Sequence, residues 1–305
     1  QSGGTISVLA GGTTLTRLAL GTLAFGSASN SGTLLVSAPA NTQVTLSAST
    51  GLANGILGAG RAVFTDGTNF DWLTSTTAST PFVLSGLAAY TGLPSGGPGV
   101  ATTNYNLTAT QTQSAAAAVG TLKITPSAAS QSLGLATFDL TFGASGGGLL
   151  VTGTNSYTIS GTGGLKVGAS GGDLVIHNYN SGGLTISAGI KDNTSSALTR
   201  LVTAGTGVTT LSGAMTYTGE TFVTGGVGSC SCGTPAAALT GFAALTDAQL
   251  NQLAIEIVKQ VRARGPFLSL SEFVNRRLRL YDGTDKDLAL NGALQAALKA
   301  LEQKP

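Results

Sequence analysis

The sequence predicts a mainly β protein: a right-handed parallel β-helix (β-solenoid) over residues 1–228, a Gly/Cys/Ala linker over 229–243 and a small α-helical module over 244–305. Three observations lead to this prediction. Short apolar alternations, cut by Gly, Ser and Asn, recur about every ten residues up to position 226. Charged residues make up only 9% of the chain. After residue 243, the period at which apolar residues recur changes from two residues, as in a strand, to that of a helix.

The predicted strands alternate with a period of two and are rich in Val, Ile, Leu and Thr. A solenoid is favoured over a sandwich or barrel because the strands are short and end in small residues, as stacked corners require. At roughly 20 to 25 residues a turn the region would make about ten turns, in a rod about 50 Å long. Only residues 113–120 read as a helical turn. The strand segments are 5–12, 33–38, 43–48, 121–128, 137–143, 149–153, 156–161, 173–180, 184–190, 208–213 and 221–226.

The composition excludes several classes of protein. Apolar residues reach 42%, so the low charge does not indicate disorder. Six basic and six acidic residues precede Cys230, and this balance offers no basic stripe for nucleic acid. No run of 18 apolar residues predicts a membrane span. The opening Gln1-Ser2-Gly3-Gly4 is typical of a cleaved or partial chain, and the Ser/Thr/Gly-rich surface indicates an extracellular or cell-surface location.

Residues 205–226, "GTGVTTLSGAMTYTGETFVTGG", carry a resemblance to the autotransporter-associated β-strand repeat. Within this motif the sequence departs from the repeat at Val208, Met215 and Glu220. Residues 60–92 are similar to the aromatic segment that precedes such repeats, and the resemblance extends over about residues 1–226. It implies a secreted or surface-displayed parallel β-helix and no defined reaction.

The C-terminal segment predicts three helices. Thr246 to Gln249 forms a capping box, and Gly265-Pro266 ends the first helix. A second helix begins at the capping box from Ser269, and a third begins near Thr284. The predicted apolar face of the first helix comprises Leu250, Leu253, Ala254, Ile257, Val258 and Val261.

The phrase "LTDAQLNQLAIEIVKQVRARGPFLSLSEFVNRRL" (245–278) resembles a module of pilin-like cassette proteins of the Verrucomicrobia. More loosely, it is similar to the helical domain of a type II secretion minor pseudopilin. The resemblance implies a role in assembling a surface filament or the cell envelope. It supplies no catalytic residues.

Cys230 and Cys232 are the only cysteines. A zinc site needs four ligands, usually in two pairs, whereas here a single His177 lies some fifty positions away. The C-x-C spacing does not fit a redox motif either. We therefore favour a linker turn whose cysteines pair with each other or with another chain. His177 follows Val175 by two positions, and we expect it to point inward or lie at a corner as a hydrogen-bonded rung residue, rather than to act as a general base.

The aromatic residues Phe70, Trp72, Phe82 and Tyr90 cluster in sequence. They are candidates for a surface that contacts a partner, and the alternative is that they pack over the coil. Nearby, Asp66, Asn69 and Asp71 allow a Ca²⁺ site, although a turn with solvated carboxylates is favoured.

Catalysis of glycan cleavage needs paired carboxylates or basic residues beside metal-binding acids, and the acids before Cys230 are few and scattered. We therefore expect no catalytic, cofactor-binding or metal-binding residues. The predicted function is a non-enzymatic structural rod that self-associates into a cell-surface fibre or filament. The alternative is a secreted adhesin that binds glycans or surfaces, and a polysaccharide-active β-helix enzyme ranks third.

Overall fold

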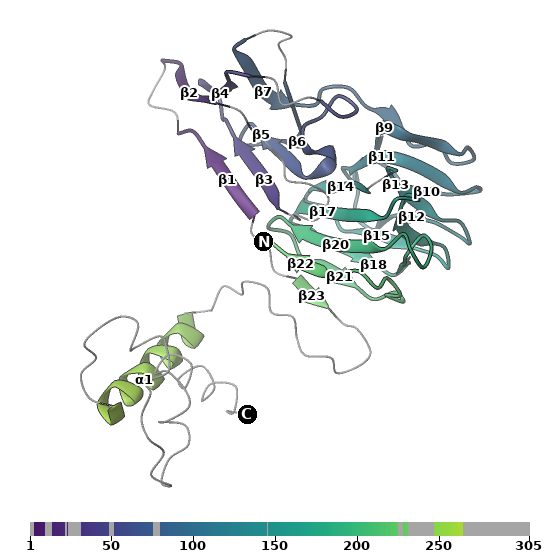
Figure 1. The fold of residues 1–305 in the computed structure, drawn as a ribbon. Coiled ribbons are helices and arrows are strands. Elements are labelled where there is room, and N and C mark those ends of the chain that lie inside the picture. Colours follow the sequence, from purple (N-terminus) through teal and green to yellow (C-terminus); the bar gives the residue numbers. More distant parts are fainter. Residues whose placement is uncertain are drawn as a thin grey trace. The chain divides into compact units, whose positions relative to one another are not determined.

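The computed structural model is mainly β (Figure 1). The chain divides into two compact units, residues 1–243 and 244–305. All described strands belong to the first unit, and the described helix belongs to the second. The structure describes residues 3–9, 14–21, 23, 32–48, 52–75, 80–144, 146–224, 228–230 and 247–264.

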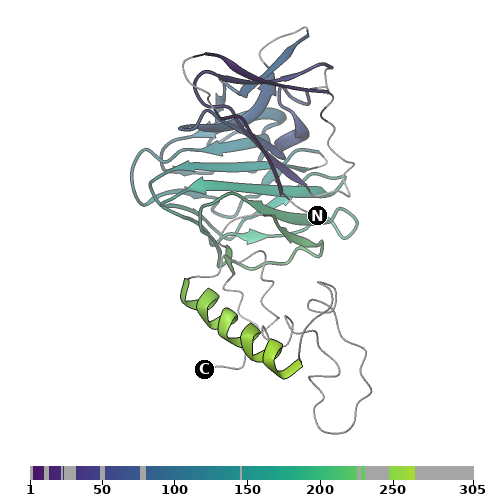
Figure 2. The same ribbon diagram turned by 90° about the vertical axis from the view of Figure 1, so that its left-hand side faces the viewer.

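A parallel β-solenoid of about seven turns occupies most of the first unit. Figure 2 shows its strands stacked one above the next. One sheet contains β10 (Gln111–Thr112), β12 (Gln131–Gly134), β15 (Tyr157–Ser160), β18 (Leu184–Ile186), β21 (Thr209–Leu211) and β23 (Gly228–Cys230). The other contains β8 (Thr91–Gly92), β9 (Gly99–Leu107), β11 (Ala117–Ile124), β13 (Leu140–Phe142), β14 (Gly146–Gly153), β16 (Gly164–Val167), β17 (Gly172–Asn180), β19 (Gly189–Ile190), β20 (Thr199–Ala204) and β22 (Thr221–Val223).

Apolar side chains stack in columns inside the coil. Leu133 pairs in register with Ile159, Ile159 with Ile186, and Ile186 with Leu211. All four side chains are buried. Each turn of the coil contains roughly 25 residues. An apolar residue that recurs at this interval therefore stacks on the equivalent residue of the next turn, about 4.8 Å away along the axis. Columns of this kind form the core of the solenoid.

The strand β11 turns a corner of the coil. Its first half pairs with β13 and its second half with β14, and its pairing with β9 shifts register around Gly120. A Cβ on Gly120 would lie 3.0 Å from the carbonyl oxygen of Thr103, a tight contact that glycine avoids. The predicted helical turn at 113–120 is wrong, because the small residues of this segment serve a strand and its corner.

The first ninety residues depart from the predicted solenoid. They form a mixed sheet in the order β1-β3-β5-β6-β7-β4-β2. Strands β1, β3 and β5 are parallel, whereas β6 and β7 pair antiparallel. The bounds are β1 (Gly3–Ser7), β2 (Thr16–Leu20), β3 (Thr33–Ser37), β4 (Thr42–Leu46), β5 (Ala62–Thr65), β6 (Phe70–Ser75) and β7 (Phe82–Gly86), with a short 3₁₀ helix η1 (Gly58–Gly60).

A tight turn explains this departure. The carboxylate of Asp66 accepts hydrogen bonds from the backbone N–H groups of Thr68 and Asn69, at 2.8 and 2.7 Å. Gly67, which follows Asp66 directly, adopts φ +93°. The chain therefore reverses after β5 instead of continuing around the coil, and the number of solenoid turns falls from the expected ten to about seven.

This N-terminal sheet packs on the outer surface of the solenoid. Trp72, Val63 and Ile56 form a buried cluster with Leu150 of β14. Inside the coil, Leu149 and Val151 of the same strand belong to the main core. Strands β14 and β17 are therefore buried on both faces, which explains their nearly continuous apolar sequence. We call this contact between the N-terminal sheet and the outer face of β14 and β17 the seam.

The second unit contains helix α1 (Asp247–Arg264), which confirms the first predicted helix. Its predicted apolar face is partly wrong, because Glu256 is buried whereas Val258 and Val261 are exposed. The second and third predicted helices lie outside the described residues. Within the described part of the chain, no helix has the length and hydropathy needed to cross a bilayer.

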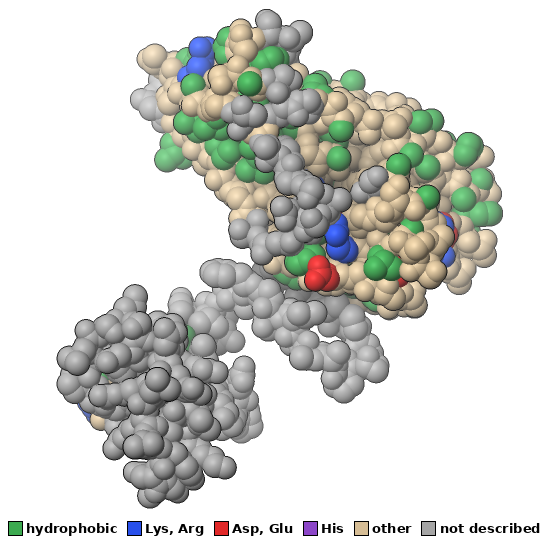
Figure 3. Space-filling view, viewed as in Figure 1, with side chains coloured by type: hydrophobic (Ala, Val, Ile, Leu, Met, Phe, Trp, Pro, Cys, Tyr) green, Lys and Arg blue, Asp and Glu red, His purple; other side chains and the backbone are tan. Residues whose placement is uncertain are grey.

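Uncharged atoms dominate the visible surface of the first unit. Figure 3 shows its charged side chains as isolated spots on a mostly polar, uncharged face. At one corner of the solenoid, Asp139 pairs with Lys166 and Lys191 at 3.0 and 2.7 Å, so part of this small set of charges is neutralised locally.

Candidate functional site

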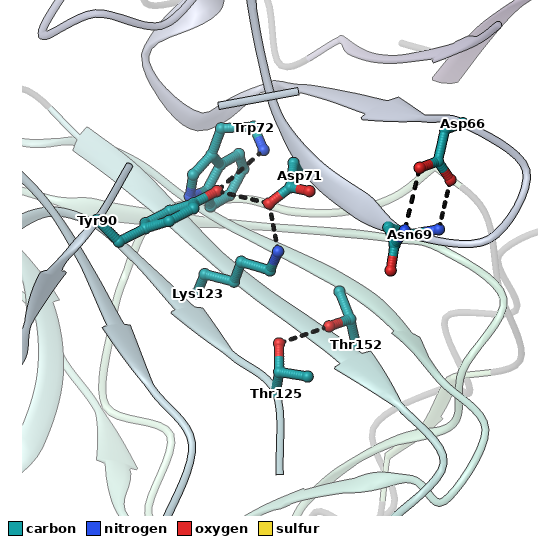
Figure 4. Close-up of polar contacts among 8 residues, drawn as sticks. All are labelled: Asp66, Asn69, Asp71, Trp72, Tyr90, Lys123, Thr125 and Thr152. Atoms are coloured by element: carbon teal, nitrogen blue, oxygen red, sulfur yellow. Dashed lines mark hydrogen bonds and ion pairs between the residues drawn. The ribbon is translucent and has the colours of Figure 1, made fainter. Parts of the chain in front are cut away.

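A cluster of polar side chains joins the N-terminal sheet to the solenoid (Figure 4). Asp71 of β6 accepts a hydrogen bond from the Tyr90 hydroxyl at 3.0 Å and forms an ion pair with Lys123 of β11. The ammonium of Lys123 lies 5.3 Å from the centroid of the Tyr90 ring. Three segments far apart in sequence are thereby joined at one carboxylate.

The electrostatics of this cluster keep the phenol of Tyr90 protonated. Burial raises the pKa of Tyr90 above its ordinary value of 10, and the negative charge of Asp71 raises it further. Tyr90 therefore serves as a hydrogen-bond donor to Asp71 and not as a phenolate nucleophile. The chemistry of the cluster suits attachment between the two layers.

The aromatic residues predicted to form one surface are separated by the fold. Trp72 has no exposed surface, so it cannot stack against a partner on this face, and that part of the prediction is corrected. Phe70 stacks on Tyr179 of β17, with ring centroids 4.1 Å apart. Phe82 packs instead against the core of the N-terminal sheet. Trp72 and Phe70 pack against Leu150 and Tyr179 of the solenoid, and strand alternation alone could not reveal this long-range contact.

His177 lies in the seam, on the outer face of β17. The prediction that it points inward is wrong, because Leu174 and Ile176 face the core of the coil. The predicted hydrogen bonding is weak: the Gly60 and Arg61 backbone acts on the ring, but among the described residues neither ring nitrogen has a partner of ordinary hydrogen-bond geometry. Burial lowers its pKa from 6.5 to about 4, against a smaller opposing effect of the Gly60 and Arg61 backbone. The ring is therefore neutral at pH 7.

Asp173 is a buried charged group of the seam, with 2% of its surface exposed. It accepts from Arg61 at 2.5 Å and from Arg200 at 2.6 Å. Arg61 precedes β5, whereas Arg200 lies on the neighbouring strand β20. Sequence analysis missed this group, because an acid at the start of a strand gives no sign of two partners so distant in sequence.

The three residues considered for Ca²⁺ do not converge. Asp66 closes its own turn and also accepts from the side chain of Asn69 at 3.0 Å. Asp71 instead faces Tyr90 and Lys123 (Figure 4). In the residues that the structure describes, no three His, Cys, Asp or Glu side chains come together as metal ligands would.

Cys230 belongs to the last strand of the solenoid. The backbone of β23 pairs with β21, and Cys230 is in register with Leu211. The strand therefore continues past residue 228, the predicted end of the solenoid, into the predicted linker that begins at residue 229. Cys232 lies outside the described residues, and the predicted bridge stays a prediction.

The outer face of the β10–β23 sheet carries in-register hydroxyl side chains. Ser132 pairs with Thr158, Thr158 with Thr185, and Thr185 with Thr210. Each is partly exposed and alternates with a buried residue. Consecutive hydroxyls therefore repeat at about 4.8 Å along the coil, forming a polar, uncharged row.

An open hollow of about 220 Å³ adjoins the N-terminal sheet and the β11 corner. Asn54, Ile56, Thr102 and Thr121 contribute to its lining, with small residues completing it, and none of the lining residues is charged. It offers hydrogen-bonding groups but no acid–base pair.

No family model, curated protein or solved structure matches the chain. The resemblances to the autotransporter-associated repeat and to pilin-like modules therefore stay predictions.

Proposed function

We propose that this chain is a non-enzymatic extracellular structural protein. In this proposal it is a right-handed β-solenoid rod that builds or decorates a cell-surface fibre by self-association, and residues 244–305 form a helical module that serves its attachment. The right hand follows from the strong preference for right-handed crossovers between parallel strands. The observation that carries the proposal is the presence of edge strands with few charges, in the N-terminal sheet and in the solenoid sheets.

Strands β1 and β2 are the outermost strands of the N-terminal sheet, and β22 and β23 are the last of the solenoid sheets. Terminal strands present unpaired backbone groups that favour pairing with another chain unless charge, proline or a cap protects them. Within the described residues, β1 has no charged side chain and β2 has only Arg17. End-to-end strand pairing between copies would then extend the rod.

Electron microscopy and sedimentation of the full chain test this proposal. We expect fibres or rods that lengthen with concentration, and we expect Ala19→Lys, which adds a charge to the exposed edge of β2, to shorten them. Thr185→Lys is the matched control, because it adds the same charge in the middle of a sheet. Compact monomers at every concentration would overturn the proposal, as would equal effects of the two substitutions.

A second candidate function, an adhesin, is favoured by the hydroxyl row of Ser132, Thr158, Thr185 and Thr210. A flat, neutral row with a regular repeat suits an extended neutral glycan or surface better than a compact charged ligand. The same pair of variants separates this function from self-association. Binding to neutral polysaccharides should be lost in Thr185→Lys and retained in Ala19→Lys, and wild-type protein that binds no glycan on an array would exclude the adhesin.

A further inference from the structure

The only tryptophan and the only histidine of the chain meet in the seam. Trp72 of β6 and His177 of β17 are in edge contact, with ring centroids 5.7 Å apart and planes inclined by 78°. At most 1% of either side chain is exposed. The contact joins the two layers directly, since Trp72 belongs to the N-terminal sheet and His177 to the solenoid.

The surroundings of His177 favour a neutral ring. Within the described residues, neither its ring nitrogens nor the indole nitrogen of Trp72 have a hydrogen-bond partner of ordinary geometry. The backbone of Gly60 and Arg61 favours an imidazolium, but less than burial disfavours it, because a buried charge without a paired counter-charge is costly.

The nearby carboxylates are already engaged. Asp173, on the same strand as His177, binds two guanidinium groups, and Asp71 of the N-terminal sheet pairs with Lys123. Neither carboxylate is hydrogen-bonded to the ring. The titratable and charged groups around the seam are Arg61, Asp71, Tyr90, Lys123, Asp173, Tyr179 and Arg200.

We propose that the seam is an acid-operated latch, in which protonation of His177 separates the N-terminal sheet from the outer face of β14 and β17 while the solenoid stays folded. The solenoid keeps its structure because its own core consists of aliphatic and aromatic side chains without a histidine. Opening exposes Leu150 and the outer surface of β17, which the N-terminal sheet covers at neutral pH.

The pH window follows from the direction of the shift. The pKa of His177 falls from 6.5 in water to about 4 in the closed seam, so the open state binds more protons between these values. The closed state is fully favoured above pH 6.5 and loses stability as the pH falls toward 4. The ratio of closed to open seam should fall roughly 80-fold between pH 6.5 and pH 4, out of a total of about 300-fold between the high-pH and low-pH limits.

Trp72 fluorescence of the full chain tests the latch. Between pH 6.5 and 4 we expect its emission to shift to longer wavelength and its quenching by acrylamide to increase, reversibly. The far-ultraviolet circular dichroism of the solenoid strands should persist over the same range. The NMR resonances of the single imidazole should titrate with the same midpoint as the Trp72 emission.

Two substitutions assign the effect. His177→Phe removes the titrating group but keeps an aromatic ring, so its Trp72 signal should stay constant from pH 6.5 to 4. His177→Gln serves the same purpose if the larger ring prevents folding. Tyr179→Phe is the control, because it changes a neighbouring ring in the seam and leaves the imidazole; it should open at the wild-type midpoint.

Three results would overturn the latch. Trp72 emission that stays constant in the wild type down to pH 4 is the first. The second is an acid transition with the same midpoint in wild type and a folded His177 variant, which would assign it to carboxylates. The third is loss of strand dichroism together with the fluorescence change, which would indicate global unfolding. If both His177 variants fail to fold, the dichroism and the NMR titration of the wild type still test the latch.

Discussion

Gly60 and Gly148 approach each other across the seam so closely that neither position has room for a side chain. A Cβ on Gly148 would lie 2.7 Å from the carbonyl oxygen of Gly60 and 2.5 Å from Cη2 of Trp72. A Cβ on Gly60 would lie 2.5 Å from the backbone nitrogen of Gly148. The fit of the N-terminal sheet on the solenoid therefore depends on backbone-to-backbone contact.

Replacing Gly148 by alanine should loosen this contact. We expect Gly148→Ala to lower the free energy of unfolding by about 1–3 kcal/mol, because neither a backbone carbonyl nor a buried indole can move away cheaply. The emission of Trp72 should shift toward that of an exposed indole. Gly92→Ala is the control, since nothing lies within 4 Å of a Cβ at Gly92; equal losses for both variants would contradict the close approach.

Removing the buried carboxylate of Asp173 should be severe. Asp173→Asn leaves Arg61 and Arg200, which are 12% and 22% exposed, without their anion. Breaking a buried ion pair from one side costs about 3–5 kcal/mol, and urea unfolding at pH 7 measures the loss. Asp66→Asn is the control, because Asp66 lies in an exposed turn, and it should change the free energy of unfolding by no more than about 0.5 kcal/mol. A mild effect at Asp173 would mean that water screens this group.

Asp139 should make stability depend on pH. Although burial opposes the effect, hydrogen bonds from Lys191 and Lys166 hold the pKa of Asp139 below its ordinary value of 3.8. The contribution of Asp139 to the free energy of unfolding is therefore present above pH 3.8. It is lost as the pH falls through the pKa that Asp139 has in the folded protein. Asp139→Asn should lower the urea midpoint at pH 7, and this difference from wild type should shrink as the pH falls below 3.8. A pH-independent difference from wild type would refute this origin.

The cysteines give a chemical prediction. In an oxidising medium Cys230 and Cys232 should form a bridge, either with each other or between chains. Mass spectrometry with alkylation before and after reduction measures it: an internal bridge adds two reactive thiols on reduction, and an intermolecular bridge also halves the mass. Two free thiols in protein isolated without reductant would refute the bridge.

Local alternation located several of the solenoid strands but missed β9, β12, β16 and β20. Ile159, Ile186 and Leu211 could be recognised from local alternation, because a period of two involves only neighbouring residues. The first helix was equally local, since the sequence signals that predict its start and its end each lie within about one turn of α1. The apolar face of that helix was not, because burial depends on what packs against it.

Only the tertiary structure decided what covers the outer face of β17. The alternation in "DLVIHNYN" shows that Val175 and His177 share a face, but both faces of this strand are apolar, so it does not indicate which face is inside. The reversal at Asp66 and Gly67 brings Trp72 and Arg61 against residues about a hundred positions later. Side-chain burial, the ion pairs of Asp173 and the low pKa of His177 all follow from that long-range packing, and no local pattern encodes them.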